Sequence, residues 1–221
     1  MRDSKDLQAD TRERVLHSAV DVFAEKGFRD ATIHEICEGA GANIAAVNYY
    51  FRSKENLYTE AWRKAFHDSL EAHPPDGGVP ENAPAEERLR GRLAALIRRV
   101  SDEEVKEFLI VHKEMANPTG LLQRVVHECL EPLQKQMVAL MRELLGPAAS
   151  DRQVRFCMMS LMSQCMEPVM RERMHRSLPG GVPHPPPLID DIEAFIDHVV
   201  TFCLGGIRAV REEIEKGGAD E

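Results

Sequence analysis

The stretch ATIHEICEGAGANIAAVNYYFRSKENLY, residues 31–58, decides the fold of this chain. Thr32 is expected to begin a short helix, because a threonine followed three residues later by a glutamate, here Glu35, forms a capping box. Gly41 provides the tight turn that follows, since glycine adopts left-handed backbone conformations without steric cost. A second short helix over 44–51 completes the pattern. Helix, glycine turn and helix in this order are typical of a helix-turn-helix, whose second helix lies in the major groove of DNA.

The second helix of this motif has two different faces. Ile44, Val47 and Phe51 form an apolar face that is expected to anchor the helix to its domain. The opposite face carries Asn43, Ala45, Ala46, Asn48, Tyr49 and Tyr50. Tyrosine hydroxyls suit phosphate oxygens, asparagine suits base edges, and alanine suits a thymine methyl group. The alternative is that the two tyrosines pack under the long C-terminal helices and that Asn48 only caps a helix.

The charge pattern supports contact with an anion at this motif. The chain has a net charge of −9, which by itself argues against nucleic acid. Between Glu38 and Glu55, however, there is no acidic residue, and Arg52 and Lys54 are present. Lys54 begins the next helix, where its ammonium and the free backbone N–H groups can hold a phosphate.

The rest of the chain repeats apolar residues with a helical period, and no segment alternates like a strand. We therefore expect an all-α fold of about nine helices, with an N-terminal helix-turn-helix domain and a C-terminal helical domain. Ser101 is expected to cap one of the later helices through Glu104. Besides the two helices of the motif, the expected helices cover residues 10–26, 54–70, 86–99, 102–116, 119–145, 151–175 and 188–216.

The predicted domains are 1–53, which carries the helix-turn-helix, and 54–221, which is helical, with the helix 54–70 as the link between them. Segments rich in proline and glycine at 73–87 and 179–187 are expected to be exposed loops. Limited apolar content in both loops agrees with that expectation.

Composition excludes several other classes of protein. The chain has 221 residues, of which 43% are hydrophobic and 29% charged, as in ordinary globular proteins. It has no apolar run of 18 residues and begins with a polar segment, so we expect neither a transmembrane helix nor a signal peptide. The five cysteines form no CxxC pair, which disfavours a disulfide scaffold or a zinc ribbon. A cytoplasmic location is therefore expected.

The tract from Thr11 to Tyr58 resembles the DNA-binding domain of the TetR family of bacterial repressors. The resemblance rests on Lys26-Gly27-Phe28, Ala31-Thr32-Ile33, Ile36, Gly41, Tyr50-Phe51 and Lys54-Glu55-Asn56-Leu57-Tyr58. It implies DNA contacts at Thr32, Asn43, Ala45, Ala46, Asn48, Tyr49, Tyr50 and Lys54. It also implies that residues 54–221 sense ligand and form the dimer. The homodimer would bind a pseudo-palindromic double-stranded operator and be released by a small apolar effector.

Shorter motifs outside this tract narrow the resemblance. NIAAVNYYF (43–51), HKEMANPT (112–119) and SLMSQC (160–165) are similar to the subgroup of the family that regulates cefoperazone and chloramphenicol sensitivity. The break at Asn117-Pro118 is expected to open space for an effector between two apolar helices. The residues expected to line this pocket are Phe66, Phe108, His112, Met115 and Asn117.

The last two helices are expected to form the dimer interface. Gly205-Gly206 lowers helix propensity, which is explained either by close helix approach in a dimer or by a simple bend. A methionine stripe on the preceding helix is explained either as helix–helix core or as an adaptable surface for a ligand or a second copy. The stripe consists of Met158, Met159, Met162, Met166 and Met170.

The alternatives to a repressor come from other classes. An activator, or a repressor without an effector, fits the same motif. A small helical enzyme using His112 and Glu114, or a helical adaptor that binds proteins, fits the helical pattern without DNA binding. No GxSxG, phosphate loop or HExxH occurs, so we expect no catalytic residue, no metal site and no cofactor.

Overall fold

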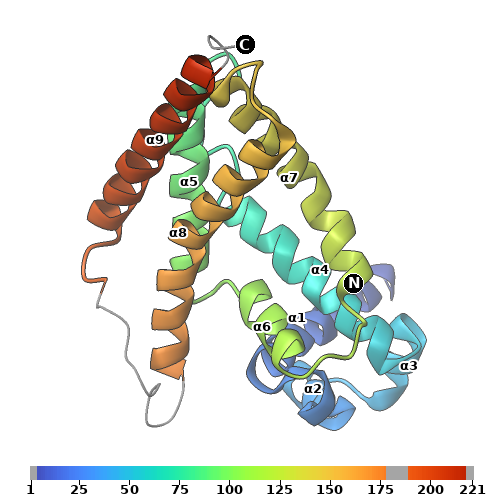
Figure 1. The fold of residues 1–221 in the computed structure, drawn as a ribbon. Helices are drawn as coiled ribbons and strands as arrows, with labels where there is room; N and C mark the ends of the chain where they lie inside the picture. Colours follow the sequence, from blue (N-terminus) through green and yellow to red (C-terminus); the bar gives the residue numbers. More distant parts are fainter. Residues whose placement is uncertain (1–3, 178–188, 218–221) are drawn as a thin grey trace. The chain divides into compact units, whose positions relative to one another are not determined.

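The computed structural model describes residues 4–177 and 189–217, which form nine helices and no strand (Figure 1). The prediction of an all-α fold is confirmed. The helices are α1 (Ser4–Asp30), α2 (Ile33–Ala40), α3 (Ile44–Phe51), α4 (Lys54–Ala72), α5 (Ala85–Ser101), α6 (Glu107–Ala116), α7 (Gln123–Leu145), α8 (Asp151–Ser177) and α9 (Ile192–Gly217). Within these ranges, none of the helices has the length and apolar content needed to cross a membrane.

The chain divides into two compact units. The N-terminal unit comprises Met1–Glu71 and Glu104–Leu130, and the C-terminal unit comprises Ala72–Glu103 and Glu131–Glu221. The N-terminal unit therefore contains α6 and the start of α7 in addition to α1, α2, α3 and most of α4. The predicted boundary after residue 53 divides the chain at a single point. The two units are defined by contacts instead, and each combines two separate stretches of sequence.

The N-terminal unit is built around α1, which packs against α2, α3 and α6. Phe23 of α1 is fully buried, and its ring meets the Tyr58 ring of α4 edge to face at 4.8 Å between centroids. Gly27 leaves helical geometry with φ 75°, at the position where the sequence predicted the first helix to stop. A Cβ added to Gly27 would lie 3.3 Å from the Lys113 Cβ, so the missing side chain lets α6 approach α1 closely.

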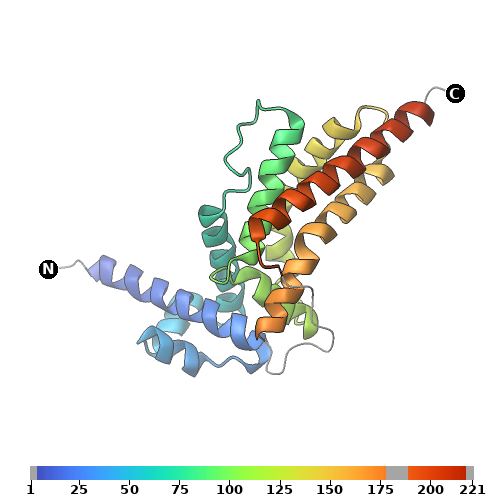
Figure 2. The same cartoon turned by 90° about the vertical axis from the view of Figure 1, so that its left-hand side faces the viewer.

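The C-terminal unit consists of α5, α8 and α9, which pack against one another, together with most of α7 (Figure 2). Leu89, Leu93 and Ile97 recur with a helical period on α5 and are fully buried. The Val100 carbonyl near the end of α5 has a hydrogen-bond partner on α8, because Arg173 Nη1 donates to it at 2.9 Å. Both groups are buried, so this bond supplies a partner that water cannot.

Several expected helix boundaries are wrong. Ser101 caps no following helix; it ends α5, where its Oγ donates to the Ile97 carbonyl at 2.7 Å. A serine hydroxyl can bond back to the preceding turn as readily as it caps a new one, and here the helix has not yet ended. α6 and α7 accordingly begin later than expected, and α1 begins earlier. The expected loop at 73–87 is confirmed up to Pro84, and the loop at 179–187 lies outside the described residues.

Candidate nucleic-acid interface

The first helix of the motif, α2, is held against α1 by a close approach. Ser18 Oγ of α1 donates to the Ile36 carbonyl at 2.9 Å, and a Cβ added to Gly39 would lie only 2.5 Å from that same Oγ. A side chain at position 39 would therefore displace the Ser18 hydroxyl and break its bond to Ile36. Gly41 ends α2 with φ 58°, in the left-handed conformation, which confirms the predicted turn into α3.

The predicted capping box at the start of α2 is confirmed. Thr32 Oγ1 accepts from the Glu35 N–H at 3.2 Å, and Glu35 Oε2 accepts from the Thr32 N–H at 2.9 Å. Lys26 Nζ donates to Glu35 Oε1 at 2.6 Å, and together with the bonds from Thr32 it lowers the pKa of Glu35 to about 2. These bonds fix Thr32 at the start of α2, and its side chain is exposed there. The N-terminal end of a helix favours an anion.

The second helix, α3, is seated by fewer side chains than expected. Val47 and Phe51 are buried, but Ile44 is 52% exposed, so the expectation that Ile44 anchors the helix is wrong. Two buried side chains one turn apart are enough to seat an eight-residue helix, and its first residue lies outside that contact. Ile44 instead adds apolar surface at the start of the exposed face.

The polar face of α3 points away from the core. Asn43 caps the helix by accepting from the Ala46 N–H at 3.0 Å through Oδ1, a bond that leaves the side-chain NH₂ uninvolved. Tyr49 is 73% exposed, which contradicts the alternative in which it packs under other helices. Tyr50 is half-buried, and its ring meets that of Tyr49 edge to face at 4.9 Å. Of the other predicted contacts on α3, Ala45 and Asn48 are exposed and Ala46 is half-buried.

Lys54 lies at the start of α4, as predicted. Its ammonium sits 4.5 Å from the centroid of the Phe28 ring, in a cation–π contact. Burial of the amine removes water from the charged form and lowers the pKa of Lys54. Ser53 caps the helix by accepting from the Asn56 N–H at 3.2 Å.

The residues expected to line an effector pocket all belong to the N-terminal unit. Phe66 of α4 is buried and stacks on Trp62 at 5.2 Å between ring centroids. On α6, Phe108 and His112 are half-buried, whereas Met115 and the C-capping Asn117 are exposed. The predicted pocket residues near the start of α6 are therefore more buried than those near its end.

Sequence reasoning missed the role of Glu114, which it considered only as a partner of His112 in an enzyme. Its carboxylate accepts from the backbone N–H groups of Thr119 at 2.9 Å and Gly120 at 2.8 Å, and from the buried Tyr58 hydroxyl at 3.2 Å. Burial, followed by the nearby Glu114 charge, raises the pKa of Tyr58. Glu114 thus connects the turn after α6 to α4. Its place within the HKEMANPT motif is the feature of the sequence that could have indicated this role.

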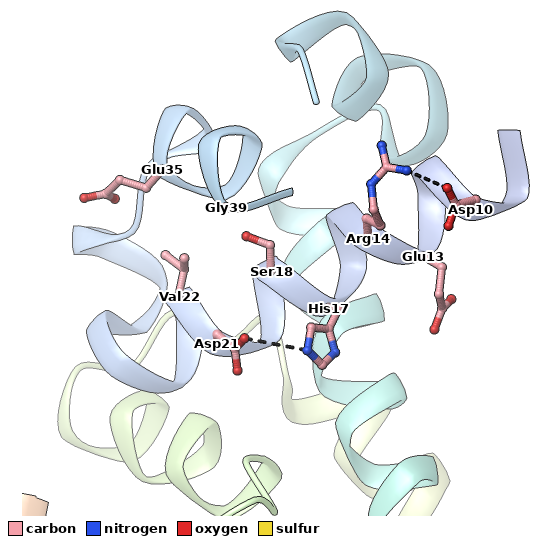
Figure 3. A pocket seen from close by; sticks show the side chains of 9 residues that line it. All are labelled: Asp10, Glu13, Arg14, His17, Ser18, Asp21, Val22, Glu35 and Gly39. Carbon is pink, nitrogen blue, oxygen red and sulfur yellow. Dashed lines mark hydrogen bonds and ion pairs between the residues drawn. The ribbon is translucent and has the colours of Figure 1, made fainter. Parts of the chain in front are cut away.

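A cavity of about 580 Å³ opens on the surface of α1 beside α2 (Figure 3). On its α1 side, Arg14 forms an ion pair with Asp10 at 2.6 Å, and the His17 ring lies 3.9 Å from the Asp21 carboxylate. None of the residues predicted to bind DNA or effector lines it. The lining residues are Asp10, Glu13, Arg14, His17, Ser18, Asp21, Val22, Glu35 and Gly39.

The C-terminal unit leaves large apolar side chains exposed on α8 and α9. Phe156 and Met159 of α8 and Phe202 of α9 are each more than half exposed. The interpretation of the methionine stripe as core within one chain is therefore wrong for Met159. Gly205 and Gly206 on α9 are exposed as well, and a Cβ added to either would meet nothing within 4 Å. Cys203, by contrast, is buried.

A capped helix, a left-handed glycine turn and a short helix that presents tyrosine and asparagine to solvent define a helix-turn-helix DNA-binding protein. Two family profiles match the chain. Bacterial regulatory proteins of the tetR family match residues 15–61, and the C-terminal domain of the HTH-type transcriptional dual regulator CecR matches residues 85–207. The chain belongs to the TetR family of transcriptional regulators. It is a DNA-binding regulator of transcription and not an enzyme.

Individual relatives agree with this assignment. The chain is 27% identical to the dual regulator CecR of Shigella flexneri over 150 residues, which are 63% of this chain and 67% of that protein. It is 44% identical to the repressor NicS of Pseudomonas putida over 52 residues, 23% of this chain and 24% of that protein. The fatty acid degradation regulator FadR of Bacillus halodurans has the same fold, with a TM-score of 0.66 at 18% identity over 88% of this chain and 98% of that one. A putative regulator of Pseudomonas aeruginosa PAO1 superposes with a TM-score of 0.70 at 14% identity over 92% and 93%.

Proposed function

We propose that the protein is a homodimeric repressor that binds a pseudo-palindromic operator through α3 and is released by a small apolar effector. The observation that carries the DNA-binding part is the exposed face of α3, with Tyr49 largely in solvent and Asn43 keeping its side-chain NH₂ available. An exposed tyrosine beside asparagine and alanine suits phosphate, base edge and thymine methyl together. The remaining contacts proposed are Thr32, Ala45, Ala46, Asn48, Tyr50 and Lys54.

Tyr49→Ala is expected to weaken operator binding by about 1–3 kcal/mol per lost contact, measured by gel retardation on promoter DNA from the gene's own neighbourhood. Tyr49→Phe keeps the ring and removes the hydroxyl, so an equal loss in both variants would assign the contact to the hydroxyl. Gln123→Ala is the control, because Gln123 is a neutral, exposed residue of α7 outside the proposed contacts. Unchanged binding by Tyr49→Ala, with Tyr50→Ala and Lys54→Ala also unchanged, would show that α3 is not the recognition helix.

The exposed apolar face of α8 and α9 supports the proposal of a homodimer. Two recognition helices must reach successive major grooves, about 34–36 Å apart, to read a two-fold operator. A two-fold interface made of the same face from each copy would cover Phe156, Met159 and Phe202, and the bare Gly205 and Gly206 would allow close approach of α9. Stable dimers of this kind commonly bury about 2,000 Å² or more.

The effector is proposed to bind beside α4 and α6, near Phe66, Phe108, His112, Met115 and Asn117. The support is Trp62, which is almost fully buried next to Phe66 and whose Nε1–H has no hydrogen-bond partner within the described chain. A buried donor without a partner is costly, and an apolar ligand with one acceptor would satisfy it. The ligand class that fits is therefore hydrophobic with a single weakly polar group.

The chain has one tryptophan, so Trp62 fluorescence reports on this site directly. Titration with hydrophobic compounds that carry one acceptor is expected to change Trp62 emission over the same concentration range that releases the operator. His112→Glu should weaken both responses together, because a charge in an apolar pocket is unfavourable. A compound that releases DNA while Trp62 emission and the His112→Glu response stay unchanged would place the effector site elsewhere.

A further inference from the structure

The turn that joins the recognition helix α3 to α4 is centred on Arg52. Its backbone has φ 67° and ψ −39°, and among the described residues no other non-glycine residue has a positive φ. The Arg52 N–H donates to the Asn48 carbonyl at 3.2 Å, and the Ser53 N–H donates to the Phe51 carbonyl at 2.8 Å. The second bond spans three residues, which makes a γ-turn with positive φ, a rare and strained conformation.

Glycine would adopt this conformation without strain, as Gly41 does at the end of α2. The turn itself is imposed by its neighbours, because Phe51 is buried and Ser53 must cap α4. The structure therefore requires the turn but not an arginine within it. Strain of this kind is retained where the side chain serves a function.

The Arg52 side chain differs from the other arginines of the N-terminal unit. It is exposed, and in the described chain its guanidinium makes no hydrogen bond or ion pair. Every other arginine that the structure describes in this unit has a partner on the protein: Arg12 with Glu60, Arg14 with Asp10, Arg29 with the Pro118 carbonyl, Arg63 with Glu60, and Arg124 with Glu128.

The surroundings of Arg52 favour an anion. No acidic residue occurs between Glu38 and Glu55, and the Glu55 carboxylate is engaged by its own backbone N–H and by Ser53, which lowers its pKa. Lys54, two residues on, directs its ammonium onto the Phe28 ring. The guanidinium of Arg52 is thus left available at the end of the helix proposed to enter the major groove.

We infer that Arg52 binds a phosphate of the DNA backbone flanking the half-site that α3 contacts, which explains an arginine in a turn that favours glycine. A guanidinium can bond two phosphate oxygens at once, which fixes position as well as charge. This inference rests on the proposed DNA binding and adds a contact that the family resemblance did not supply.

The test uses the full-length protein and a duplex that the wild type selects from a random pool. Arg52→Gln removes the charge and keeps the strained turn, whereas Arg52→Gly removes both. Each is expected to bind that duplex about tenfold more weakly at about 0.1 M salt, and the slope of log K against log salt should become shallower by about 0.9 for each bound head. Arg52→Lys should keep the slope. Arg124→Gln, a neutralised exposed arginine on α7, is the control and should keep both affinity and slope.

Thermal unfolding separates this role from a structural one. Arg52→Gly should melt higher than the wild type, by about 2–4 °C, while binding DNA more weakly, because glycine relieves the turn. If Arg52→Gln and Arg52→Gly bind the selected duplex with wild-type affinity and slope, the Arg52 contact is overturned and the proposed function stands. If the wild type selects no duplex, the proposed function fails and the Arg52 contact fails with it.

Discussion

Phe202→Asp is expected to convert the protein from the proposed dimer, of about twice 24.9 kDa, to a monomer, and to weaken operator binding at least about 100-fold. Phe202 is 59% exposed on α9, so the substitution leaves the fold of one chain intact. In the proposed interface, however, it would bury an unpaired charge, which apolar contacts cannot offset. The two recognition helices would then bind their half-sites independently. The operator affinity would lose the contribution that comes from linking the two helices in one dimer.

Sedimentation velocity at micromolar concentration measures the first effect, and gel retardation on the promoter duplex measures the second. Met159→Asp on α8 should behave in the same way, because it lies on the same proposed face. Ala148→Asp adds the same charge at an exposed turn between α7 and α8 and should remain dimeric. A dimeric Phe202→Asp protein with wild-type operator affinity would rule out α8 and α9 as the interface.

Glu114→Ala is expected to lower the free energy of unfolding of the N-terminal unit by about 2–4 kcal/mol. The carboxylate accepts from the backbone of Thr119 and Gly120 and from the Tyr58 hydroxyl, and its removal leaves that buried hydroxyl without its acceptor. The Thr119 hydroxyl donates to the same carboxylate at 2.9 Å. Hydrogen bonds to a charged group are stronger than neutral ones, so four lost together exceed the effect of an ordinary surface change.

Denaturant unfolding followed by circular dichroism measures this effect. Tyr58→Phe removes only one of the bonds and should cost about 1 kcal/mol. Glu128→Ala on α7 is the matched control, because Glu128 forms only an exposed pair with Arg124, and such pairs contribute about 0–1 kcal/mol. A Glu114→Ala protein as stable as the Glu128→Ala protein would show that the turn after α6 is held by other contacts.

Those features of the fold that depend on neighbouring residues could be predicted from the sequence. The capping box of Thr32 and Glu35 and the turn at Gly41 each involve residues within one or two turns of each other. Local sterics and hydrogen bonding determine such features, so a short stretch of sequence is enough to specify them. The length of α3 and the outward position of Tyr49 followed from the same local pattern.

Features that depend on contacts between distant segments were decided only by the tertiary structure. The exposure of Ile44 depends on how far the surface beneath α3 extends, and the bond from Ser101 back to Ile97 depends on α5 continuing to that residue. Glu114 meets Tyr58 across 56 positions of sequence. Helical periodicity shows that a side chain faces the interior or the solvent, but it does not show which distant group lies opposite, because that is determined by the packing of all the helices in the unit.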